Sequence, residues 1–93
     1  MKYVVFADDN AHFMDESERI KIGEFESEAD AIAKCSEIVD KYLLEYRPQF
    51  ETAAQLYESY TSYGDDPFVK GPTQVNFSAW DYAKEKCEAL YGD

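Results

Sequence analysis

The spacing of apolar residues differs between the start of this chain and its later part, and that difference constrains the fold more than any other feature. Residues 3–7 are apolar throughout and residues 19–22 alternate with the period of two that a half-buried β-strand requires. In three later segments the apolar residues recur every three or four residues, as on one face of a helix. The chain is therefore expected to begin with strands and to continue mainly with helices.

Residues 3–7 are β-prone and apolar on both faces, which is typical of a central strand. The next segment alternates strictly, so Ile20 and Ile22 are expected to face a core while Arg19 and Lys21 face water. The two segments are predicted to pair as an antiparallel hairpin. Residues 8–18 would then form a connection much longer than the usual hairpin loop of about 2–5 residues, and long loops are often functional.

Three later segments each begin with a serine or threonine and carry Asp or Gln three residues further on, as in a helix cap. The pairs are Ser27 with Asp30, Thr52 with Gln55, and Ser78 with Asp81. The first helix is expected to end near Tyr46 because Pro48 disfavours helical geometry at the residue before it. Each helix is predicted to bury one stripe of side chains. The stripe of the first helix contains Ile32, Cys35, Val39, Tyr42, Leu43 and Tyr46. That of the second contains Ala53, Leu56, Tyr57, Tyr60 and Tyr63, and that of the third contains Trp80, Ala83, Cys87, Leu90 and Tyr91.

The segment between the second and third helices contains two short β-prone pieces. Residues 65–67 (Asp-Asp-Pro) are expected to turn the chain, and one or both of the pieces 68–70 and 75–77 would join the sheet. The resulting prediction is one α+β domain over residues 1–93, in the order ββααβα. Its small antiparallel sheet, the hairpin plus one short strand from the C-terminal half, would carry three helices on one face.

The formal net charge is −11, and residues 8–30 contribute nine acids against two basic residues. A surface this negative repels phosphate, so no direct nucleic-acid binding is expected. No apolar run approaches the roughly 20 residues of a membrane span, and residues 1–7 are too short for a signal-peptide core. A cytoplasmic location is therefore predicted, with both cysteines reduced and buried.

Three blocks together, FADDNAHFMDESERIKIGEF, YTSYGDDPFV and FSAWDYAKEKCE, resemble a family of short uncharacterised bacterial proteins of about this length. The similarity covers nearly the whole chain. It implies a bacterial, cytoplasmic, one-domain protein, and it brings no activity, cofactor or site residue.

The connection between the two predicted strands holds a cluster of possible metal ligands. A calcium EF-hand loop is excluded, because Phe13 stands where that loop needs glycine and Arg19 where it needs glutamate. A looser Mg²⁺ or Mn²⁺ site stays possible, since such sites need only a few carboxylates and keep water. The candidate ligands are Asp8, Asp9, His12, Asp15 and Glu16.

Two groups of apolar and aromatic residues are candidates for protein contacts. Phe13 and Met14 lie in the middle of the acidic connection and either fold back onto the domain or present a tip to a partner. Tyr57, Tyr60 and Tyr63 cannot all face inward equally, because their stripe drifts around the helix. Tyrosine is enriched at interfaces, although these rings could equally build the core.

No catalytic residue or cofactor is predicted. A nucleophilic pair of His12 with Cys35 or Cys87 is disfavoured because both cysteines fall on apolar helix stripes. A structural zinc site needs about four ligands, mostly Cys and His, and His12, Cys35 and Cys87 provide only three. The leading hypothesis is a protein-interaction or regulatory module that meets a protein partner or a second copy. The alternative is a divalent-cation protein or metal-dependent hydrolase built on residues 8–18.

Overall fold

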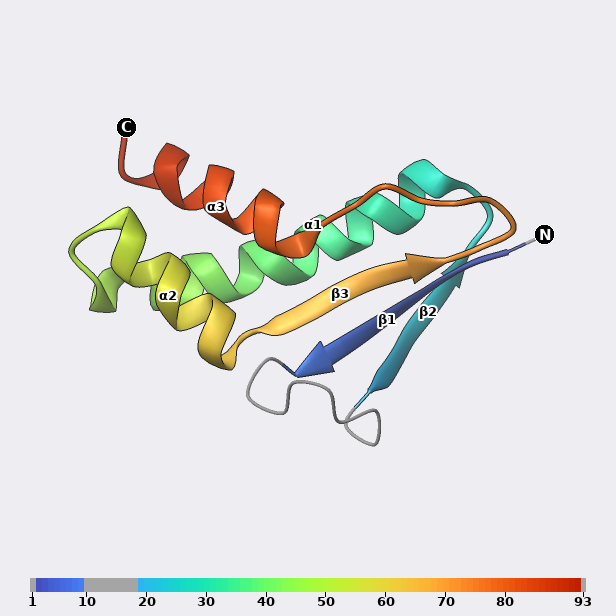
Figure 1. Cartoon of the computed structure of the whole chain (residues 1–93), viewed down its shortest axis with the longest axis horizontal. Helices are drawn as coiled ribbons and strands as arrows, with labels where there is room; N and C mark the ends of the chain where they lie inside the picture. Colours follow the sequence, from blue (N-terminus) through green and yellow to red (C-terminus); the bar gives the residue numbers. More distant parts are fainter. Residues whose placement is uncertain (1, 10–18, 93) are drawn as a thin grey trace.

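The structure is a computed structural model that describes residues 2–9 and 19–92. These residues form an α+β fold in the predicted order ββααβα (Figure 1). The elements are β1 (Tyr3–Asp9), β2 (Ile20–Phe25), α1 (Glu28–Tyr46), the short 3-10 helix η3 (Arg47–Gln49), α2 (Ala53–Tyr63), β3 (Asp65–Lys70) and α3 (Ala79–Leu90).

The three strands form one antiparallel sheet in the order β2-β1-β3, so the predicted central strand is confirmed. Figure 1 shows α1, α2 and α3 grouped on one side of the sheet. Val5 and Ala7 of β1 point toward these helices and are buried, as is Pro67 of β3. Because side chains alternate along a strand, Phe6 and its cross-strand partner Phe68 point to the opposite side. We call that side the outer face.

The pairing of β1 with β2 contains a β-bulge. Val5 lies opposite Gly23, whereas Phe6 lies opposite Lys21, so Ile22 is an extra residue on β2. A bulge bends its strand and increases the local twist. Ile22 therefore interrupts the regular ladder in the middle of an edge strand.

The third strand begins earlier than predicted. Asp65, Asp66 and Pro67 were expected to turn the chain, but they form the first half of β3 and pair with β1. Proline is tolerated here because β3 is an edge strand, where its missing N–H group removes no ladder bond. Residues 75–77, the other β-prone piece, lie outside the strands of the described part of the chain.

All three predicted caps are present. The backbone N–H groups of Asp30, Gln55 and Asp81 donate to the side-chain oxygens of Ser27, Thr52 and Ser78. The first helix ends at Tyr46 as predicted. Each cap satisfies an N–H group that has no partner within its helix, which is worth about 1 kcal/mol.

The core has two parts. One lies between the helices and contains Val39, Leu43, Leu56, Tyr60, Ala79, Ala83 and Cys87. The other lies between the first half of α1 and the sheet and contains Val5, Ala31 and Cys35. Trp80 was predicted to be buried, but its side chain is exposed at the start of α3.

No helix among residues 2–9 and 19–92 has the length and apolarity needed to cross a membrane.

Candidate functional site

The apolar face of β2 is left uncovered by the helices. Ile20 lies opposite Ala7, which faces the helices, so Ile20 points to the same side. Ile20 is nevertheless 62% exposed and Ile22 is 37% exposed. The prediction that both isoleucines face a core is therefore wrong. The cause is the packing of distant elements. Among the strands, α1 contacts β3 and β1 more than β2, so β2 extends beyond the layer of helices.

A groove separates β2 from α1, and we call it the β2–α1 groove. Its volume is about 370 Å³. The lining residues are Ile22, Ile38, Lys41, Tyr42, Glu45, Tyr46, Tyr63, Gly64 and Asp65. The walls are mainly apolar and aromatic, and charged side chains stand at the rim. This composition is typical of a binding site in which a few polar groups fix orientation.

The α1 side of the groove follows from a second stripe on that helix. Ile38, Tyr42 and Tyr46 recur every four residues, beside the fully buried stripe of α1, so they lie along one side of it. The Tyr42 and Tyr46 ring centroids are 4.5 Å apart. The Tyr42 hydroxyl lies 2.6 Å from the Ser59 Oγ atom, which fixes the ring against α2. This wall is therefore held by side-chain contacts before any ligand arrives.

Tyr63 stands where this groove meets a second depression. It is the last residue of α2 and is 72% exposed, the largest value among the large hydrophobic residues that the structure describes. The second depression, which we call the adjoining trough, has a volume of about 690 Å³. It is lined by Gln49, Phe50, Glu51, Gln55, Glu58, Ser59, Ser62 and Tyr63. Tyr63 therefore projects between an apolar groove and a polar, acidic trough.

Of the three candidate tyrosines in α2, only Tyr63 is exposed. Tyr60 is fully buried and donates a hydrogen bond of 2.6 Å from its hydroxyl to the backbone oxygen of Asp65. Burial, and then the nearby Asp66, raises the pKa of the Tyr60 phenol. Tyr60 is thus a core residue and cannot contact a partner, which corrects its assignment to an interaction surface. Tyr57 is partly buried against the helical core.

The candidate metal ligands are only partly covered by the structure. Asp8 and Asp9 lie at the end of β1, while His12, Asp15 and Glu16 lie outside the described residues. Both carboxylate oxygens of Asp8 accept hydrogen bonds from the Arg19 guanidinium, at 2.8 and 3.1 Å. Within residues 2–9 and 19–92, no group of three or more acidic, histidine or cysteine side chains is placed to hold a metal ion. The Mg²⁺ or Mn²⁺ site therefore stays a prediction.

The interaction candidates Phe13 and Met14 also lie outside the described residues. At one end of the sheet, two pairs of acidic residues lie opposite each other on β1 and β3: Asp8 is opposite Asp66, and Asp9 is opposite Asp65. Burial, and then Asp9, raises the pKa of Asp65. Asp65 lines the β2–α1 groove, so a carboxylate with a raised pKa stands at this end of the groove.

Cys35 and Cys87 belong to the two parts of the core, while His12, the other member of the disfavoured nucleophilic pair, lies outside the described residues. Cys35 and Cys87 are free and buried, as predicted. Burial raises the pKa of each thiol to about 11, with a smaller contribution from Asp66 at Cys35 and from Glu88 at Cys87. Because the thiolate is the reactive species, thiols with this pKa are almost entirely unreactive near neutral pH.

Part of this surface was missed by reasoning from sequence. The alternation of β2 showed which side its isoleucines face but not whether a helix covers them. The repeat of Ile38, Tyr42 and Tyr46 was readable as a second stripe, and the charged rim of Lys41 and Glu45 follows from the same spacing.

Comparisons with known proteins add no assignment. No family model matches the chain, no curated protein matches it, and no solved structure matches it.

Proposed function

We propose that this chain is a small acidic protein-interaction module that binds a protein partner through the β2–α1 groove. The observation that carries the proposal is the exposure of Ile22 and Tyr63, which line one groove, together with that of Ile20, two residues from Ile22 on the same strand. Single exposed apolar residues are ordinary on protein surfaces, but a contiguous group rimmed by polar side chains is typical of an interaction site.

The construction of the groove supports the same proposal. Tyrosine supplies a large contact area with few rotatable bonds, so ordering it on binding costs little entropy. Tyr42 is already fixed by Ser59 and by the Tyr60 ring, whose centroid lies 5.6 Å away. A preformed wall of this kind reduces the free energy that binding must spend on ordering.

We also infer a reducing compartment such as the cytoplasm. The support is the pair of free cysteines, which belong to separate parts of the core and are both buried. Thiols persist in this form where glutathione and thioredoxin keep them reduced.

The proposal is tested by photo-crosslinking. A photoreactive phenylalanine analogue replaces Tyr63 in one version of the full chain and Trp80 in another, and each is expressed in cells that make the protein naturally. Trp80 is the matched control because it is also an exposed aromatic residue but does not line the groove. The expected result is a discrete adduct from position 63 and none from position 80.

Competition then shows that the adduct reports the groove. Excess unlabelled wild-type chain should abolish the adduct at position 63, whereas the double variant Ile22→Ser/Tyr63→Ser should not. An absent adduct, or equal adducts from both positions, would contradict a role for this groove in partner binding.

A further inference from the structure

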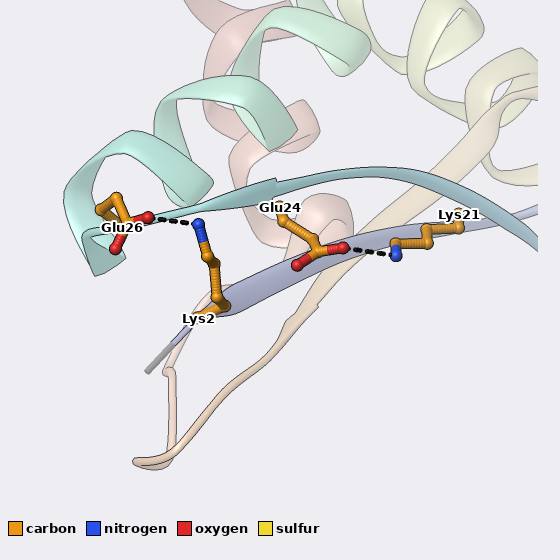
Figure 2. Close-up of polar contacts among 4 residues, drawn as sticks. All are labelled: Lys2, Lys21, Glu24 and Glu26. Carbon is orange, nitrogen blue, oxygen red and sulfur yellow. Dashed lines mark hydrogen bonds and ion pairs between the residues drawn. The ribbon is translucent and has the colours of Figure 1, made fainter.

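Among residues 2–9 and 19–92, the side chains on the outer face of the sheet carry no net charge. Its basic side chains are Lys2, Arg19, Lys21 and Lys70, and its acidic side chains are Asp8, Glu24, Glu26 and Asp66. The strand register places Lys21, Lys70, Asp8, Glu24 and Asp66 on this face. Arg19 belongs to it through its contacts with Asp8 and Phe68, and Lys2 and Glu26, which bond to each other, continue the alternation just outside the paired residues. Figure 2 shows two of the ion pairs that neutralise this face, Lys2 with Glu26 and Lys21 with Glu24. The Lys21 Nζ and Glu24 Oε2 atoms are 2.7 Å apart.

The same cations also cover the aromatic side chains of the outer face. The Arg19 Cζ atom lies 4.8 Å from the centroid of the Phe68 ring. The Lys70 Nζ atom lies 5.9 Å from the centroid of the Phe6 ring. Long basic side chains laid over apolar rings shield them from water. The outer face is therefore neutral and covered by its own side chains.

The negative charge is consequently concentrated on the side of the helices. The described residues include nine basic and sixteen acidic side chains, and four of each lie on the outer face. The whole excess of acid in this part of the chain therefore belongs to the remaining surface. Around the groove and the adjoining trough stand Glu45, Asp65, Glu51 and Glu58, against the single basic residue Lys41.

We propose that the β2–α1 groove takes a partner segment that places a large apolar side chain against Ile22 and Tyr63 and Lys or Arg side chains on the acidic rim. This inference rests on the proposed function and names the chemistry of its partner. Cations of a partner would stand beside Asp65 and Glu45, and the trough would extend the same charge along a longer segment.

The raised pKa of Asp65 is consistent with this arrangement. Burial and the opposing Asp9 make the charged form of Asp65 costly in the isolated chain. A cation placed at the rim would stabilise that charged form, because an opposite charge within about 4–6 Å favours ionisation. Binding would therefore relieve a cost that is present in the unbound chain.

Two other occupants fit the groove less well. A second copy of the chain would bring the same negative charge to an acidic rim, and like charges facing across an interface cost several kcal/mol. An added β-strand would have to pair with β2, whose ladder is interrupted at Ile22. Bulges on edge strands hinder pairing with another strand. Insertion of side chains into the groove needs no such pairing.

A designed peptide tests the inference. The probe is a peptide of about 14 residues, roughly four helical turns, with leucine and lysine at amphipathic spacing. One control peptide replaces lysine by glutamate, and another replaces leucine by serine. The full ¹⁵N-labelled chain is titrated with each and observed by amide NMR. We expect saturable shifts at the groove residues with the leucine–lysine peptide alone.

Matched variants separate the groove from general attraction to an acidic protein. Tyr63→Ala should weaken binding about tenfold, equivalent to about 1.4 kcal/mol, and Trp80→Ala should change it by less than about twofold. Glu45→Gln/Asp65→Asn should weaken binding by about three- to tenfold. The equally charged control Glu85→Gln/Glu88→Gln lies on α3 outside the groove and should have little effect.

The outcomes distinguish this inference from the function on which it rests. A crosslink at position 63 without binding of the leucine–lysine peptide would contradict the proposal of a basic partner segment. It would still support the proposal that the chain is a protein-interaction module. Equal weakening by the two double variants, or equal binding of the serine-substituted peptide, would show charge attraction alone and would overturn the inference. A crosslinked product of twice the chain mass would identify a second copy as the occupant, which would also overturn it.

Discussion

Tyr60 and Tyr63 offer a sharp test of the fold, because they lie three residues apart on α2 in opposite environments. Tyr60 is fully buried, and its hydroxyl donates to the Asp65 backbone oxygen. Tyr63 is 72% exposed. Truncation of each side chain to alanine removes the same atoms from the same helix. Any difference in the free energy of unfolding therefore reports environment and not chemistry.

The expected magnitudes are far apart. Tyr60→Ala should cost about 3–5 kcal/mol, as for other large buried aromatic side chains, because it removes packing and leaves a cavity. Tyr60→Phe keeps the ring and loses only the hydrogen bond, so it should cost about 0.5–1.5 kcal/mol. Tyr63→Ala should change the free energy of unfolding by less than about 0.5 kcal/mol.

Urea unfolding followed by far-UV circular dichroism measures these differences. For a domain of this size each kcal/mol should also lower the Tm by about 4–8 °C. If the Tyr60→Ala variant does not fold, the free energy of unfolding of Tyr60→Phe is compared with that of Tyr63→Ala instead. Equal costs for Tyr60→Ala and Tyr63→Ala would refute the placement of α2, and so would a Tyr63→Ala cost above about 2 kcal/mol.

Three further predictions address other parts of the structure. Gly64→Ala should destabilise the chain by about 1–3 kcal/mol, because the new Cβ atom would lie 2.5 Å from the Tyr60 ring, whereas Gly23→Ala meets only ordinary contacts and should be tolerated; thermal unfolding compares the two. Burial and the opposing Asp8 raise the pKa of Asp66, so its contribution to stability is present at low pH and is lost as pH rises through the folded-state pKa. Asp66→Asn should therefore raise stability at neutral pH and lose this advantage below about pH 3.8, as urea unfolding at both pH values will show. Both thiols should react slowly with Ellman's reagent at pH 8 in the native chain and rapidly after denaturation, since burial raises each thiol pKa to about 11; fast reaction of the native chain would contradict their burial.

The features that sequence predicted correctly are those that depend on neighbouring residues. Each helix begins at a serine or threonine whose side chain reaches an N–H group three residues later. The apolar run of β1 placed it in the centre of the sheet, because a strand that is apolar on both faces needs neighbours on both edges. Such signals are local and do not depend on how distant elements pack.

The features that sequence did not predict depend on the packing of distant elements. The alternation of β2 is the same whether or not a helix lies over it, so Ile20 and Ile22 were expected to be buried. Asp65 to Pro67 carry turn propensity, yet pairing with β1 holds them in a strand. The spacing of Tyr60 and Tyr63 likewise cannot show that Tyr60 is buried and donates to the Asp65 backbone oxygen while Tyr63 is exposed.

Over residues 2–9 and 19–92, the unequal distribution of charge makes an electric dipole. One end of that dipole is the neutral sheet face with its Lys2–Glu26 and Lys21–Glu24 pairs, and the other is the acidic side that bears the groove. A molecule of this kind rotates in the field of a basic surface before it touches that surface. Most encounters would then begin with the groove already turned toward the partner, and the rate of association would fall as added salt shortens the Debye length to about 10 Å or less.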